Sequence, residues 1–122
     1  MSTSVPPGWP HVVPPAGTPG WQRRAVGWLL DLCPSDYRAH AVLARQPLVL
    51  VYLAGQHVRA QLDGLARAAA TLRAELSGQV PAPVVDEALL VLDVERARLL
   101  SAVRAADLIG AALRGSTYVP RL

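Results

Sequence analysis

The side chains best suited to catalysis or metal binding are few in this 122-residue sequence, and they lie far apart. Cys33 is the single cysteine, and the three histidines are His11, His40 and His57. Two metal ligands share a helix face when they are three or four residues apart, whereas successive histidines here are 29 and 17 residues apart. We therefore expect no metal site, no cofactor and no small-molecule substrate, and we expect that the protein is not an enzyme.

Cys33 is followed by Pro34, which disfavours helical geometry at the preceding residue and so places the cysteine at the end of a predicted helix. The negative pole of the helix dipole at that end disfavours a thiolate, and no neighbouring motif supplies a base. We expect the thiol to be a small, buried, structural group. Because one cysteine cannot form an internal disulfide, we also expect a reducing compartment and a cytoplasmic location.

All 12 basic residues are arginines, and the formal net charge is +3. Arg59 and Arg73, with Arg67 and Arg45, could line part of one helix face, and Arg96, Arg98 and Arg104 part of another. Nucleic-acid binding usually needs a denser basic stripe and aromatic side chains that stack on bases, whereas acidic residues interrupt both of these sets. Protein binding is therefore the favoured expectation, with accessory nucleic-acid binding through the arginine-bearing helix faces as the alternative.

Aromatic and charged residues outside a simple helix interface are the candidates for partner binding. Asp36-Tyr37-Arg38 is the most polar motif between the predicted helices, and a recognition loop or helix capping with a local ion pair explains it equally well. The candidate partner-binding residues are Trp9, Trp21, Trp28, Tyr37, Arg38 and Arg96.

The first of the elements that position these residues is a proline-rich N-terminal arm, residues 1–18. Residues 1–20 contain six prolines and three glycines, which favour turns and polyproline II over helix or sheet. No continuous apolar segment remains there, so no signal peptide is expected. Since Trp9, Val12 and Val13 would be unusual in a solvated tail, we expect part of the arm to pack on the rest of the chain, with a free tail as the alternative.

A single helical domain, residues 19–122, is expected to follow the arm. Its predicted helices cover residues 19–33, 47–77 and 83–114. Each begins beside a proline, whose fixed φ suits the first helical turn, and the two long helices end before Gly78 and Gly115. Residues 34–46 are expected to be a connector with one helical turn.

Both long helices carry apolar residues at alternating spacings of three and four, the heptad pattern of a coiled coil. In the second helix the pattern comprises Val51, Gly55, Val58, Leu62, Leu65, Ala69, Leu72 and Leu76. In the third it comprises Val85, Leu89, Leu92, Arg96, Leu99, Val103, Ala106, Gly110 and Leu113. Antiparallel pairing with a constant number sum of 161 places the fold-back point between Val80 and Pro81, where Gly78 independently predicts a turn. Arg96 interrupts the pattern, and we expect it to reach towards Asp93 or Asp63 or to contact an acidic partner.

The predicted fold is all-α: a long, antiparallel, coiled-coil-like helical hairpin with a short N-terminal helix packed at its open end. Leu48–Leu53 is apolar on every side of a helix, so more than one segment must cover it. The first and third helices can each cover one side, and the arm, residues 116–122 or a second copy of the chain is the available cover for the rest. The longest strongly apolar run, Leu48–Ala54, is far below the ~20 residues that cross a bilayer, so no membrane partner is expected.

The segment Gly20–Arg38, with WLLDLCPSDYR at 28–38, and the closing YVPRL at 118–122 resemble a group of small uncharacterised helical proteins from high-GC Gram-positive bacteria. The resemblance spans most of the chain and implies no activity. It fits the exclusive use of arginine, because a GC-rich genome favours arginine over lysine. The expected function is a non-enzymatic protein–protein interaction, scaffold or regulatory role, with a second copy of the chain among the expected protein partners.

Overall fold

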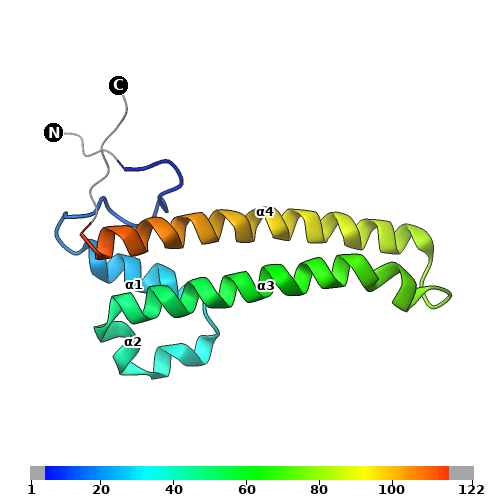
Figure 1. Ribbon diagram of the computed structural model, residues 1–122, viewed down its shortest axis with the longest axis horizontal. Helices are drawn as coiled ribbons and strands as arrows, with labels where there is room; N and C mark the ends of the chain where they lie inside the picture. Colours follow the sequence, from blue (N-terminus) through cyan, green and yellow to red (C-terminus); the bar gives the residue numbers. More distant parts are fainter. Residues whose placement is uncertain (1–4, 116–122) are drawn as a thin grey trace.

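Figure 1 shows the computed structural model of the protein, which describes residues 5–115. Regular structure over this range is helical and contains no strand. The elements are α1 (Trp21–Asp31), the 3-10 helix η1 (Ser35–Ala39), α2 (Ala41–Arg45), α3 (Pro47–Leu76) and α4 (Ala82–Leu113). The predicted all-α class is confirmed, whereas residues 116–122, which were expected to join the open end, lie outside the described range.

The two long helices begin and end within one residue of their predicted bounds. Pro47 opens α3 and Pro83 lies in the first turn of α4, where the missing N–H of proline costs no helical hydrogen bond. Between the helices, Gly78 adopts a left-handed φ of 78°, which residues with a Cβ rarely adopt. The conformations of Gly78 and Pro83 therefore favour the end of α3 and the start of α4 at these positions.

α3 and α4 lie side by side along their length (Figure 1). Near the connecting turn, the Arg73 guanidinium lies 2.6 Å from the Asp86 carboxylate. Towards the other end, a Cβ built on Gly110 would lie 3.6 Å from Cγ2 of Val51, and the predicted register pairs these two residues. Contact partners thus occur in opposite order along the two helices, which is consistent with the predicted helical hairpin.

The face of α4 that meets α3 differs from the predicted heptad pattern near its middle. Arg96 is exposed, whereas the preceding Glu95 is half-buried beside the buried Leu99. Placing Arg96 in the interface was therefore wrong. A helix with 3.6 residues per turn drifts relative to a strict heptad repeat, so a neighbouring position can take over after several turns. Ala69, predicted on the matching face of α3, is likewise exposed.

The main hydrophobic core lies at the end of α3 and α4 that is far from the connecting turn (Figure 1). It draws on the N-terminal arm and all four α-helices, and its buried members are Trp9, Val13, Trp21, Ala25, Leu29, Leu43, Leu50, Val51, Ala54, Ala106 and Ile109. Two helices alone bury one face each, so the third layer made by the arm, α1 and α2 is what creates an enclosed interior.

α1 is shorter at both ends than the predicted helix over 19–33. The Thr18 hydroxyl donates to a carbonyl three residues earlier at 2.6 Å and does not cap the helix. Gly20, with a φ of 80°, precedes the first helical residue. Because a left-handed residue cannot continue a right-handed helix, the start moves to Trp21, and the helix ends at Asp31.

The N-terminal arm packs on the main core through a tryptophan. The indole N–H of Trp9 donates to the Val13 carbonyl at 2.8 Å, and the Trp9 ring lies 6.1 Å from the ring of Trp21. Trp9 and Val13 are both buried. The expected packing of part of the arm is therefore confirmed at these two residues, whereas Val12, which lies between them in the chain, is exposed.

The connector between α1 and α3 is more helical than predicted. In place of one turn it contains η1 and α2, which meet at His40. Leu43 in α2 is buried in the main core and anchors the segment. The one predicted turn corresponds to η1, whereas α2 was not predicted, because a helix of five residues is too short for a periodic apolar pattern to appear.

The molecule therefore has two regions (Figure 1). In the stalk, residues 61–99, α3 and α4 pack on each other. In the head, residues 5–60 and 100–115, the arm, α1, η1 and α2 surround one end of the same two helices. A small cluster of Val58, Leu99 and Ala102 joins the two regions.

Candidate interaction surface

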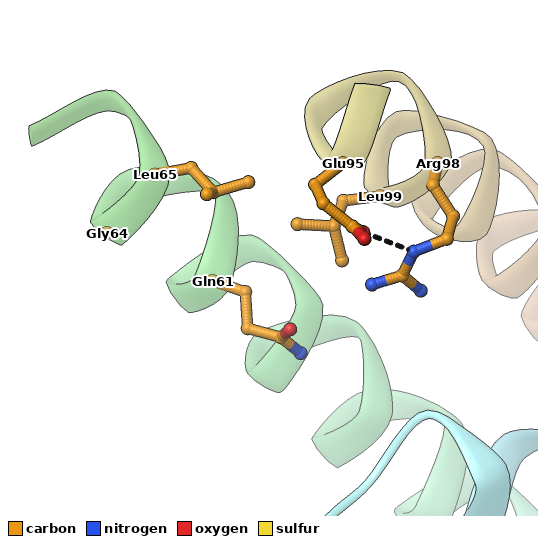
Figure 2. Close-up of a pocket in the computed structure, with 6 residues that line it drawn as sticks. All are labelled: Gln61, Gly64, Leu65, Glu95, Arg98 and Leu99. Carbon is orange, nitrogen blue, oxygen red and sulfur yellow. Dashed lines mark hydrogen bonds and ion pairs between the residues drawn. The ribbon is translucent and has the colours of Figure 1, made fainter. Parts of the chain in front are cut away.

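An open depression between α3 and α4, called the stalk groove here, marks the point where the head gives way to the stalk. It has a volume of about 330 Å³ and is lined by Gln61, Gly64, Leu65, Glu95, Arg98 and Leu99. Leu65 and Leu99 point towards each other from the two helices, and Arg98 Nε donates to Glu95 at 2.6 Å beside them (Figure 2). An apolar floor with a charged rim is typical of protein-binding surfaces.

The stalk groove opens where the third layer of the head ends. Leu32, directly after α1, packs against the cluster of Val58, Leu99 and Ala102. Gly64 adds no side chain to fill the space beyond it, and nothing lies within 4 Å of a Cβ built there. The groove therefore continues a surface that is already used for helix packing in the head.

The most exposed aliphatic side chains of the stalk lie on α4. Val94, Leu90 and Val91 are 69%, 65% and 58% exposed. Residues at alternating spacings of three and four share one face of a helix. One such set on α4, called the outer stripe here, comprises Val84, Glu87, Val91, Val94, Arg98 and Ser101.

A second exposed apolar group lies at the start of α3, within the run at 48–53 that was expected to need cover on every side. Leu50 is fully buried, whereas Leu48, Val49 and Tyr52 are exposed. Helices α1, α2 and α4 pack on α3 here, and within residues 5–115 they and the arm leave these three side chains exposed. Of the covers expected for the remaining side, a second copy of the chain stays a prediction, and residues 116–122 lie outside the described range.

A smaller polar cavity of about 110 Å³ lies between α3 and α4 in the head. Arg59 Nη2 donates to both carboxylate oxygens of Asp107, at 3.0 and 3.2 Å. Gly55 and Gly110 leave room for arginine side chains, since a Cβ built on each would lie 2.9 Å from Arg59 Nη1 and 3.1 Å from Arg114 Nη1. The cavity is thus the margin of an ion pair that the chain itself completes.

Ion pairs occupy several arginines that were considered for nucleic-acid binding. The pairs are Arg59 with Asp107, Arg73 with Asp86, and Arg98 with Glu95. Each pair is solvent-exposed, so acidic groups interrupt the positive charge along both long helices.

The tryptophans among the candidate partner-binding residues serve the core. Trp9 and Trp21 are buried, and Trp28 is half-buried against the same cluster. A partner could reach Trp9 or Trp21 only after the arm had detached. Arg96 is exposed on the stalk, whereas these indoles belong to the main core of the head or pack against it, so the structure does not bring the four residues together.

Tyr37 and Arg38 hold the connector against α1. Arg38 pairs with Asp31 in the last turn of α1, and Tyr37 is half-buried against the main core. Cys33, which lies in the chain between Asp31 and Tyr37, is also half-buried. Burial raises the pKa of its thiol, and the positive charge of Arg38 partly offsets this rise. The motif therefore has a structural explanation of the kind that was weighed against a recognition loop.

The outer stripe was not among the predicted site residues, although its signal is present in the sequence. One heptad pattern was assigned to each long helix, and α4 carries a second, offset pattern. A search for every heptad phase on a helix, including phases that contain charged residues, would have found it.

No family model, no curated protein and no solved structure matches this chain. Among residues 5–115, no three metal-binding side chains converge, and no helix in that range is both long enough and apolar enough to cross a bilayer. The candidate site is therefore defined by its geometry: the stalk groove and the outer stripe, which share Arg98.

Proposed function

We propose that the protein is a non-enzymatic protein–protein interaction or scaffold protein whose antiparallel, coiled-coil-like hairpin presents the stalk to an α-helical partner. The observation that carries the proposal is the outer stripe, where Val91 and Val94 are more than half exposed. Heptad spacing suits a partner that is itself a helix. The division into an arm over 1–18 and one helical domain over 19–122, and a cytoplasmic location, belong to the same proposal.

The division of labour between the two regions supports a scaffold role. The enclosed core of the head fixes one end of both long helices. The sixteen residues of α3 that lie in the stalk extend on the order of 25 Å beyond the head at ~1.5 Å per residue. A rigid projection with an exposed apolar face can hold a partner at a defined distance from the head.

Nucleic-acid binding through the arginine faces has less support, because the exposed carboxylates of Asp86, Glu95 and Asp107 neutralise three of those arginines. Salt separates the two functions. Affinity for a polyanion falls steeply as salt rises, whereas an apolar protein interface changes little.

The test uses two matched variants as baits in an extract of the native cells. Val94→Asp places a charge on the outer stripe, and Leu100→Asp places the same charge on an exposed residue outside it. We expect wild type and Leu100→Asp to retain the same proteins at high salt, and Val94→Asp to lose them. Retention by all three baits, or a salt-sensitive retention of nucleic acid that Val94→Asp does not change, would contradict the proposal.

A further inference from the structure

We propose that the outer stripe of α4 pairs with the outer stripe of a second copy of this chain, in antiparallel orientation. The inference rests on the proposed function and names its partner. The twofold axis passes between Leu92 and Asp93, so that the numbers of facing residues add to 185. The hairpin of each copy stays intact, and the two stalks lie side by side with their heads at opposite ends.

This axis pairs the residues of the outer stripe by chemical type. Val91 of each copy faces Val94 of the other, which gives two adjacent valine layers at the centre. Val84 faces Ser101 at both ends. Leu90 flanks the stripe and is 65% exposed. It does not face a residue of the second copy directly, and its neighbour along the same edge of the interface is the small Ala97 of that copy. The three most exposed aliphatic side chains of the stalk are therefore the ones that become buried.

Glu87 and Arg98 fix the register. They are 11 residues apart on one helix, about 16 Å along its axis, so they cannot pair within one molecule. Under the proposed axis, Glu87 of each copy faces Arg98 of the other. A shift of seven residues in either direction would set Glu87 against Val91, or Arg98 against Val94, and leave a charge facing a valine. The existing contact between Arg98 and Glu95 is an exposed pair of small energetic value, so it does not oppose the new one.

The outer stripe is also the uncovered part of a longer heptad pattern. In the head the pattern continues through Ala105, Leu108 and Ala112, which are buried or half-buried. The N-terminal arm provides cover there, because a Cβ built on Gly8 would lie 3.6 Å from Leu108 Cδ1. The uncovered stretch, residues 84–101, has its midpoint at the same axis that pairs the charges. A second copy therefore extends in the stalk a packing surface that the chain itself already uses in the head.

The first experiment measures molecular mass in solution by sedimentation equilibrium. We expect a dimer for wild type and for Leu100→Asp, which carries the same charge outside the outer stripe. Val94→Asp places two unpaired charges in each dimer, and we expect its dissociation constant to rise by about 100-fold or more. Circular dichroism checks that each variant keeps its helical content, which is expected because Val94 is exposed in the single chain.

The second experiment tests the register by reversing charges. Glu87→Arg alone sets two arginines against each other at both ends of the interface, and Arg98→Glu alone sets two glutamates against each other. We expect each variant to be largely monomeric. An equal mixture of the two restores opposite charges at every Glu87 and Arg98 position, so we expect mixed dimers in native mass spectra and no excess of either self-dimer.

Three results would overturn this inference. Wild type could remain monomeric at the highest concentration it tolerates, it could form a dimer that Val94→Asp leaves intact, or the mixture of charge variants could fail to associate. A dimer that persists in Val94→Asp would direct attention to Leu48, Val49 and Tyr52 instead. If wild type is monomeric but Val94→Asp loses the proteins captured from cell extract, self-pairing is wrong and the proposed function stands.

Discussion

The head and the stalk are built on the same two helices but bury them to very different extents. Of the sixteen buried hydrophobic side chains in residues 5–115, only Val85 and Leu99 lie in the stalk. The head surrounds α3 and α4 with a third layer, whereas in the stalk each helix has one covered face. The third layer is what encloses the core of the head, and without it the stalk keeps an exposed surface on both long helices.

Truncating one leucine in each region tests directly whether the head contributes more to stability than the stalk. Leu50→Ala removes a fully buried side chain, and we expect the free energy of unfolding to fall by about 3 kcal/mol. Leu72→Ala removes a half-buried side chain of the stalk, and we expect a loss of about 1 kcal/mol. Urea unfolding of dilute protein, followed by far-UV circular dichroism, measures both. Equal losses would mean that the stalk is as well covered as the head.

The contribution of the arm to the head is the next largest effect. Trp9→Ala removes a buried indole and its hydrogen bond to Val13, and we expect a loss of about 2 kcal/mol. The loss stays below that of a central core residue because the arm can detach without unfolding the helices. Val12→Ala, at a neighbouring position that is 57% exposed, is the control and should cost less than about 0.5 kcal/mol. A Trp9→Ala protein as stable as wild type would remove the arm from the head.

The Cys33 thiol gives a smaller effect, which depends on pH. Because burial raises the pKa of its thiol, we expect slower alkylation of native than of unfolded protein at neutral pH. Arg38→Ala removes a charge that lowers this pKa, so alkylation should slow further. A folded-state pKa above the unfolded value favours folding below the unfolded pKa, and this contribution disappears as pH rises through the folded value. Stability should therefore fall slightly at alkaline pH in wild type and not in Cys33→Ala.

The ion pair near the connecting turn should have the smallest effect. Arg73 and Asp86 are both more than half exposed, and such pairs contribute about 0.2–1 kcal/mol at most. We expect Arg73→Ala to lower the unfolding free energy by less than about 0.5 kcal/mol, and the difference to vanish at high salt. A loss comparable to that of Leu50→Ala would show that the tip of the stalk is ordered by electrostatics.

The long elements of the fold were predictable because their signals accumulate over many turns. α3 and α4 each have a proline at the start. Both are long enough for the apolar spacing to recur over many turns, so the sequence predicts both helices. η1 and α2 have five residues each, and α1 is displaced by the left-handed Gly20, so local sequence could not fix their bounds. At those positions tertiary contacts of single residues such as Leu43 decide the structure.

The candidate site could be predicted only in part, since surface and core use similar residues. Trp9 and Trp21 suit a partner interface as well as a core, and the docking of the arm decides between the two. The spacing of the outer stripe is plain in the sequence, yet two heptad patterns on α4 compete for α3. Which of them is left exposed depends on packing that the spacing does not contain.

The position of the tryptophans has a consequence for spectroscopy. Trp9, Trp21 and Trp28 are the three tryptophans of the chain, and all of them lie in the arm or in α1. Indole fluorescence therefore reports on the head alone, whereas the far-UV dichroism comes mainly from α3 and α4. Unfolding curves from the two signals coincide if the molecule melts as one cooperative unit. A fluorescence change that precedes the loss of dichroism would record the third layer leaving while the two long helices remain paired.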